Sequence, residues 1–182
     1  MQKAIIYVLT AILALMPAMV HAQNSGLPYI VEIATVENDN LGAVTSQLMD
    51  IPKGDEHNYY ICLGQMGFGN DIVQINLDPF FFLFIPLGNT IEEARATMEE
   101  MQKLYKSPSL TTSETQGCLA VGFPVEELET VTLTHRKAFL SNTLEFSIER
   151  DGYLRVTYLN KSDFSSLLNG LKFYKKLHPK LQ

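Results

Sequence analysis

The sequence predicts an α+β fold, a mainly antiparallel sheet with two amphipathic helices packed on it. Three observations predict it. Short alternating runs dominate the chain, an Asp-Gly dipeptide separates two of them, and two longer segments carry apolar residues at helical spacing. The order along the chain is strands, helix, strands, helix, and this order raises the hypothesis of two similar halves, 23–107 and 108–182.

The first part of the chain reads as a strand, a short helix and a hairpin. Residues 28–36 alternate in the manner of a strand, whereas 41–49 place apolar residues at helical spacing. Aromatic and β-branched residues at 57–63 begin a hairpin whose return starts at residue 72. The run 80–85 is apolar without a break and is followed by a proline, which is typical of a strand buried on both faces.

The clearest helix follows this run. Thr90 and Glu93 stand in the register of a capping box, in which each side chain bonds a free backbone N–H of the first turn. Apolar residues then recur at helical spacing as far as Leu104, and Pro108 lies just beyond the end.

The last third of the chain is more regular. Four strands are predicted there, at 118–123, 131–139, 144–148 and 154–158. Asp151 and Gly152 favour a tight hairpin turn, because both central residues of such a turn adopt positive φ. Ser162 or Asp163 is expected to cap the final helix, in which an apolar stripe runs from Phe164 to Tyr174.

Composition excludes several classes of protein. Of 182 residues, 46% are hydrophobic and only 19% are charged, which is typical of a folded domain rather than a disordered tail. The formal net charge of −6 argues against a nucleic-acid partner. Two cysteines are too few for a disulfide-stapled mini-fold or a cysteine-rich zinc module.

Residues 1–22 have the pattern of a cleaved signal peptide. Lys3 precedes an apolar segment, and Val20-His21-Ala22 offers small or aliphatic residues where a signal peptidase requires them. The alternative is an uncleaved membrane anchor, but Pro17 interrupts an apolar segment that is already short for a bilayer. We therefore expect export to the periplasm or the extracellular space, a single domain over 23–182, and no transmembrane segment after leader removal.

The two cysteines, Cys62 and Cys118, leave two alternatives open. An oxidising compartment permits a disulfide between them. Each also lies in an apolar run, where a free thiol behaves as a small buried hydrophobe. Sequence alone does not choose between these alternatives, because the choice depends on the distance between the two Cα atoms.

No catalytic constellation is visible in the sequence. The histidines outside the leader, His57, His135 and His178, are scattered over a loop edge, a strand and a helix end. Cys118 with His135 as its base is a weak candidate, since apolar neighbours raise a thiol pKa. The sequence therefore predicts no catalytic residue, no metal site and no cofactor.

One charge pattern is worth attention in an acidic chain. Lys172, Lys175, Lys176 and Lys180 lie on the polar side of the final helix. They either complement the negative end of the helix dipole or form a patch for an anionic partner, such as an envelope polymer or an acidic protein surface. Aromatic residues of the predicted strands, Tyr59 and Tyr60 first among them, are further candidates for partner contact.

These features favour an exported, non-enzymatic binding or interaction domain. The alternative is a cell-envelope hydrolase whose active groups converge only in three dimensions, and a histidine within hydrogen-bond reach of a carboxylate would favour it. A third hypothesis is a subunit of an exported assembly, for which Tyr153 and Tyr158 would belong to an exposed aromatic patch.

Overall fold

The computed structural model describes residues 29–38, 44–64, 67–68, 82–121 and 123–179. These residues form nine strands and two helices, and the predicted α+β class with an antiparallel sheet is confirmed. In chain order the elements are β1 (Val31–Asn38), β2 (Val44–Asp50), β3 (Tyr59–Leu63), β4 (Gly67–Phe68), β5 (Phe82–Gly88), α2 (Ile91–Leu104), β6 (Thr112–Ala120), β7 (Glu129–Lys137), β8 (Asn142–Arg150), β9 (Tyr153–Asn160) and α3 (Lys161–Leu177).

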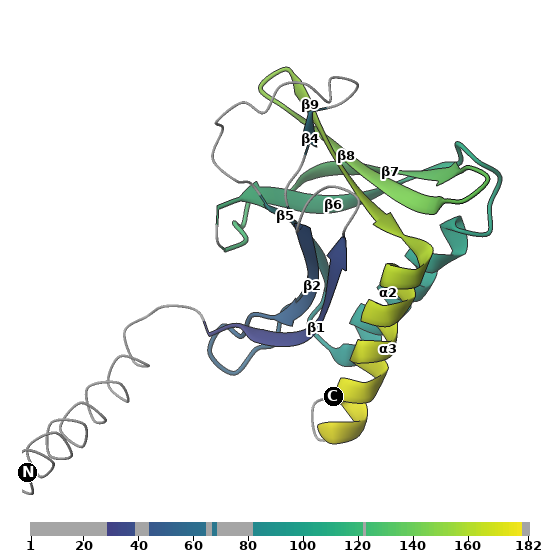
Figure 1. The fold of residues 1–182 in the computed structure, drawn as a ribbon. Coiled ribbons are helices and arrows are strands. Elements are labelled where there is room, and N and C mark those ends of the chain that lie inside the picture. The colour runs from purple at the N-terminus through teal and green to yellow at the C-terminus, as the bar shows by residue number, and fades with distance from the viewer. Residues whose placement is uncertain (1–28, 39–43, 65–66, 69–81, 122, 180–182) are drawn as a thin grey trace, which may run out of the picture.

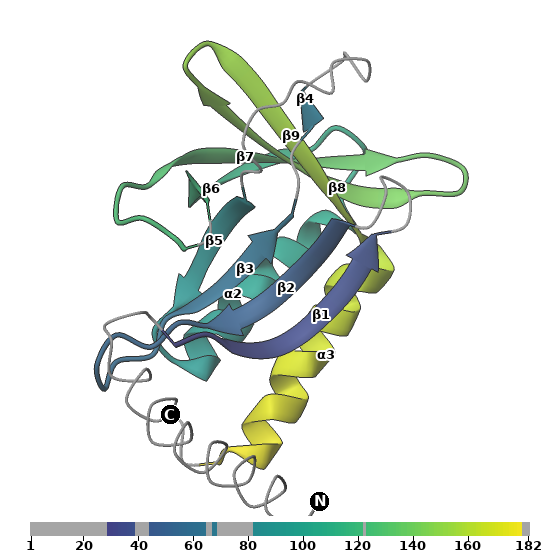
Figure 2. The ribbon, with the colours of Figure 1, turned by 60° about the vertical axis from the view of Figure 1, so that its left-hand side comes forward.

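All neighbouring strands are antiparallel, in the order β1-β2-β3-β5-β6-β7-β8-β9-β4. Strand β6 is shared between two parts of the sheet. Its residues 112–117 pair with β7, whereas 118–120 pair with β5. We call β1, β2, β3 and β5 the first sheet half, and β7, β8 and β9 the second sheet half. Figure 2 shows the second half running across the end of the first.

Gly117 is the residue at which β6 changes partner. A Cβ atom there would lie 2.8 Å from Val131 Cγ2, 2.9 Å from Ile85 Cδ1 and 3.0 Å from the carbonyl oxygen of Phe84. These groups come from both sheet halves. Glycine therefore allows the two halves to approach each other closely at the changeover.

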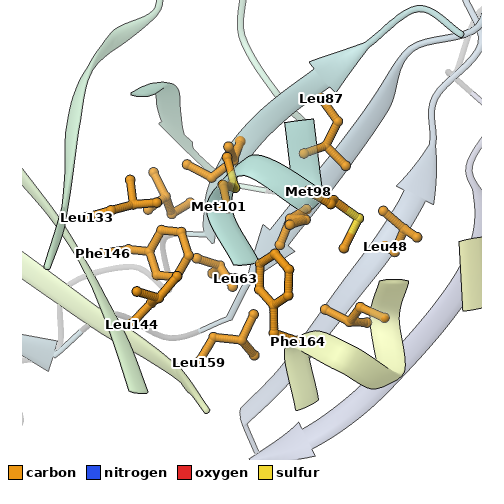
Figure 3. Packing of buried hydrophobic residues seen from close by; sticks show 14 of the residues in the cluster. Leu48, Leu63, Leu87, Met98, Met101, Leu133, Leu144, Phe146, Leu159 and Phe164 are labelled. Carbon is orange, nitrogen blue, oxygen red and sulfur yellow. The ribbon is translucent and has the colours of Figure 1, made fainter. Parts of the chain in front are cut away.

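Both helices pack against the sheet and against each other. Helix α2 contacts β5 and β3, α3 contacts β1 and β2, and the two helices lie side by side (Figure 1). The main core joins the helices to both sheet halves. Figure 3 shows its side chains directed toward one another, among them Leu48 and Leu63 of the first half, Met98 and Met101 of α2, Leu133, Leu144 and Phe146 of the second half, and Phe164 of α3.

Two local predictions are wrong. The short helix predicted over 41–49 is replaced by strand β2 from Val44 on, because Leu48 is buried in the main core and its neighbour Met49 in a second cluster. Burial on successive residues is typical of a central strand, which is covered on both faces. The N-cap of α3 is Asn160, not Ser162 or Asp163. The side-chain oxygen of Asn160 accepts a hydrogen bond from the Asp163 N–H at 2.8 Å.

The capping box of α2 is confirmed. Thr90 Oγ1 accepts from the Glu93 N–H at 3.2 Å, and Glu93 Oε2 accepts from the Thr90 N–H at 3.1 Å. Hydrogen bonds from the backbone of Asn89 and Thr90 lower the pKa of Glu93. The predicted hairpin return from residue 72 lies outside the described residues. Within the part of the chain that the structure describes, neither helix is long and apolar enough to cross a bilayer.

Candidate functional site

Three of the four predicted lysines line one groove. Helix α2 and helix α3 run antiparallel, so the beginning of α2 lies beside the end of α3 (Figure 1). Between these ends is a groove of about 490 Å³, lined by Ile91, Arg95, Leu171, Lys172, Lys175, Lys176 and Pro179. Lys180, the fourth predicted lysine, lies outside the described residues.

The floor of the groove is apolar. Ile91 opens α2 and Leu171 belongs to the buried stripe of α3, and both are part of the main core. Neither side chain can change its position without disrupting the core in which it packs. The groove is therefore a fixed surface rather than a gap between loose elements.

The charges around this floor are only partly balanced. Lys175 forms an ion pair with Glu92, while Lys172 and Arg95 share Glu99, at 3.9 and 3.7 Å. The groove thus has four cations and two paired carboxylates. Among the described residues no carboxylate forms an ion pair with Lys176. Because these side chains are about half exposed, the pairs hold their geometry weakly and an incoming anion can compete for the lysines.

The same lysines also suit the helix itself. Lys175 and Lys176 are in the last turn of α3, where positive charge complements the helix dipole. Sequence reasoning missed Arg95, which lines the groove from α2, and the neighbouring Glu92 and Glu99. No local signal connects Glu92 and Glu99 with the lysines of α3, because these partners are more than seventy residues away along the chain.

The two tyrosines predicted to contact a partner do not share a surface. Tyr59 is buried in the main core beneath the helices, and burial raises its pKa well above the ordinary range. Tyr59 is therefore not available to a partner. Tyr60 is half-buried on the opposite face of β3, where its ring lies edge-on to Phe84 with centroids 6.3 Å apart. Neither tyrosine lines the groove.

The cysteines are both free and buried. Cys62 is opposite Phe84 on β5, and Phe84 is opposite Cys118 on β6. The cysteines are thus two strands apart, about 10 Å at the usual strand spacing, which is too far for a disulfide. Burial, with a contribution from Cys118, raises the pKa of Cys62 to about 12, and burial also raises the pKa of Cys118. Of the two alternatives, the structure has the buried thiols.

His135 is a structural residue. It is fully buried, its Nδ1 lies 3.2 Å from the carbonyl oxygen of Pro108, and its Nε2 lies 2.9 Å from Asn142 Oδ1. Both ring nitrogens are occupied, so neither is left to act as a base on a thiol. The side chain instead ties the loop after α2 to strands β7 and β8.

Sequence reasoning missed a pairing between His57 and Asp50. His57 Nδ1 lies 2.6 Å from Asp50 Oδ2, and the Asn58 N–H donates to Asp50 Oδ1 at 3.1 Å. Asp50 is fully buried, whereas His57 is partly exposed. A carboxylate behind an imidazole orients the ring as in general-base catalysis. Here the His57 ring also gives the buried carboxylate of Asp50 a hydrogen-bond partner. Among the described residues, no hydroxyl or thiol group forms a hydrogen bond with His57.

Two further observations bear on the chemistry of the molecule. Within the described ranges, no group of three or more His, Cys, Asp or Glu side chains is placed to hold a metal ion. The His178 ring packs against that of Tyr174 at the end of α3, with ring centroids 4.5 Å apart and planes tilted by 38°. In comparisons with known proteins, the chain matches no protein-family model, no curated protein and no solved structure.

Proposed function

We propose that this chain is an exported binding domain that retains an anionic partner in the groove between α2 and α3. One observation carries the proposal. Two helices far apart in the sequence gather four cations around an apolar floor and pair only two carboxylates with them, in a chain of net charge −6. Concentrated positive charge in an otherwise acidic protein attracts and orients negatively charged partners.

The expected partner is an acidic envelope polymer or an acidic protein surface in the periplasm or outside the cell. Its anionic groups would bond Lys176 and compete with Glu92 and Glu99 for Lys175 and Lys172. Ile91 and Leu171 are already buried, so its aliphatic parts would lie against the lysine side chains and Pro179 above this floor. Because the cations are exposed, binding should be of moderate affinity and should weaken as salt is added. The compartment is supported by the leader pattern in residues 1–22.

We also propose that 23–107 and 108–182 are related halves. The strands-then-helix order occurs twice, and each half supplies one wall of the groove, α2 from the first and α3 from the second. The groove would then be the place where the two related units meet.

Calorimetric titration with polyglutamate and with polyphosphate tests the binding proposal. The variant Lys175→Gln/Lys176→Gln removes two cations from the groove. Lys53→Gln/Lys103→Gln removes two exposed lysines that form single surface ion pairs elsewhere. We expect the native protein and the control to bind one of the polyanions and the groove variant to lose at least about tenfold in affinity. Equal loss in both variants, or no binding by the native protein at low salt, would contradict the proposal.

The alternative function is that of a cell-envelope hydrolase, and the Asp50–His57 pair favours it. Under this alternative His57 would activate a water molecule or a substrate hydroxyl, with Asp50 holding the imidazole. A panel of chromogenic esters and glycosides tests it. Turnover that disappears in His57→Gln but persists in Lys175→Gln/Lys176→Gln would favour the hydrolase over the binding domain.

A further inference from the structure

The turn between β7 and β8 has an unusual composition. Ala138 donates to the Ser141 carbonyl oxygen at 2.9 Å and Ser141 donates back to the Ala138 carbonyl oxygen at 3.4 Å. Phe139 and Leu140 are therefore the two central residues of a tight turn, and they are 100% and 93% exposed. Figure 2 shows this hairpin extending beyond the helices at one side of the molecule. We call Phe139 and Leu140 the hairpin tip.

Neither turn geometry nor packing accounts for these two residues. Two-residue hairpin turns favour Asn-Gly or Asp-Gly, whose backbones adopt positive φ easily. Neither tip residue is among the described residues with positive φ. Their side chains touch no core and gain nothing from folding, since hydrophobic stabilisation comes from surface removed from water. A residue choice that the fold does not require is a sign of function.

A third exposed apolar side chain lies at the same end of the molecule. Leu110 precedes β6 and its N–H donates to the His135 carbonyl oxygen at 2.7 Å, so its loop runs beside β7. Leu110 is 63% exposed and holds a φ of 70°, which is unfavourable for a residue with a large side chain. The backbone thus presents a leucine to solvent at a position that glycine or asparagine would occupy more easily.

Three exposed lysines lie close in sequence to this apolar end or to the base of its hairpin. Lys137 precedes the tip by two residues. Asn142 donates to the Tyr105 carbonyl oxygen at 3.3 Å and Thr143 pairs with Asn160, so Lys106 and Lys161 are close in sequence to residues that contact the base of the hairpin. All three lysines are exposed, and none forms an ion pair with a described residue. The acidic residue of this hairpin nearest to the tip in sequence, Glu145, is already held by Arg136 through two bonds of 3.0 Å.

We propose that the hairpin tip inserts into the surface of an anionic lipid membrane. Phe139 and Leu140 enter the boundary between head groups and acyl chains, while Lys106, Lys137 and Lys161 face the anionic head groups. Apolar side chains combined with a basic flank are the usual elements of such peripheral binding. This inference does not depend on the anionic partner proposed for the groove.

The size and shape of the tip favour a membrane over a protein pocket. An aromatic side chain buries about 150–250 Å², so two or three exposed residues fall well short of the ~800 Å² that each partner contributes to a stable protein interface. A lipid surface needs no complementary shape, and here electrostatic attraction supplements the small apolar area.

Membrane binding at the tip would also orient the molecule. Helix α3 begins directly after Asn160, which pairs with the base of the hairpin, and its last turns line the groove. Its 17 residues span about 25 Å, so the groove lies at the far end of the helix from the tip. A molecule bound through the tip would present the groove away from the lipid.

Vesicle cosedimentation tests the proposal. The protein is purified in the form that cells export and mixed with phosphatidylcholine vesicles, with or without phosphatidylglycerol. Phe139→Ser/Leu140→Ser removes the tip. Tyr153→Ser/Leu154→Ser is the matched control, because it removes an aromatic residue and a leucine that are 59% and 50% exposed beside the other tight turn. Thermal unfolding of each variant verifies that the fold is intact.

We expect binding to vesicles that contain phosphatidylglycerol, a loss of about tenfold or more in the tip variant, and little change in the control. Substitution of Lys106, Lys137 and Lys161 by Gln should weaken binding and reduce its salt dependence. The proposal is overturned if the native protein ignores anionic vesicles or if tip and control variants bind equally well. It is also overturned if the tip variant binds anionic vesicles as well as the native protein does and loses only the capture of a protein.

Discussion

Two tight turns in the second sheet half are built from opposite kinds of residue. Between β8 and β9, Asp151 and Gly152 have φ values of 57° and 75°, the conformation that such a turn favours. Between β7 and β8, Phe139 and Leu140 occupy the corresponding two positions and are almost fully exposed. The first turn has the residues that its geometry requires, and the second has residues that its geometry merely tolerates.

The difference distinguishes turn residues that the fold requires from turn residues that it does not require. The Asp-Gly turn was predictable from sequence because its residues carry a conformational preference. The Phe-Leu turn was not predicted, because a run of apolar residues normally indicates a strand, and residues up to 139 were assigned to one. The signal that was overlooked is Ser141-Asn142 directly after the apolar pair, since both residue types favour turns.

The largest expected difference is between two phenylalanines of the β7–β8 hairpin. Phe146 is 0% exposed and packs in the main core, whereas Phe139 is fully exposed. Phe146→Ala should lower the free energy of unfolding by about 3–5 kcal/mol. Phe139→Ala should change it by less than about 0.5 kcal/mol. Urea unfolding of the two variants measures both, and a similar loss in each would contradict the assignment of Phe139 to a solvent-exposed tip.

Exchange of the turn residues should have the next largest effect. Asp151→Phe/Gly152→Leu places large side chains where both φ values are positive, at a cost of about 2–3 kcal/mol in the free energy of unfolding. The hairpin should remain paired, because β8 and β9 are in register along their whole length. An unchanged urea midpoint would show that this turn does not need its Asp-Gly sequence.

The converse exchange should be small. Phe139→Asn/Leu140→Gly introduces residue types that are common in turns, and because neither tip residue has a positive φ, the free energy of unfolding should change by less than about 1 kcal/mol. Binding to anionic vesicles should be lost in the same variant. A clear loss of stability would mean that the tip residues have a structural role.

The buried thiols of Cys62 and Cys118 report on the folded core, and substitutions at the hairpin tip should not change their reactivity. Below about pH 8.5 the thiols of both the native and the unfolded protein hold their protons. Above it the unfolded chain releases them, while Cys62 in the folded protein holds its proton to about pH 12. Stability should therefore be complete below about pH 8.5 and decrease as the pH rises toward 12.

At pH 8 the native protein should react slowly with a thiol-specific disulfide reagent, and urea should expose both thiols. Tip variants should react at the native rate, and Phe146→Ala should react faster because it unfolds more often. Rapid reaction of the native protein would contradict the burial of Cys62 and Cys118.

Sequence predicted those features that depend on local chemistry. The capping box at Thr90 and Glu93, the strand around Phe84 and the turn at Asp151 all follow from preferences within a few residues. The strand at 44–50 was missed because Leu48 and Met49 are buried on opposite faces, and such burial can imitate helical spacing.

The candidate site was predictable only in part. The lysines of α3 were visible as a charge pattern, but Arg95, Glu92 and Glu99 become their neighbours only through the packing of α2 on α3. The separation of Cys62 from Cys118 depends on β5 lying between their strands, and Asp50 meets His57 only when the β2–β3 hairpin closes. These are consequences of strand order and helix packing, which no local pattern encodes.

The most direct test of the membrane-facing tip uses an intrinsic property of the chain, which contains no tryptophan. Phe139→Trp and Tyr153→Trp each introduce one fluorophore, at the two contrasting turns. When vesicles containing phosphatidylglycerol are added, emission from position 139 should shift to the blue and be quenched by lipids brominated in their acyl chains, while emission from position 153 stays unchanged. No shift at position 139, or equal shifts at both positions, would contradict insertion of the β7–β8 turn.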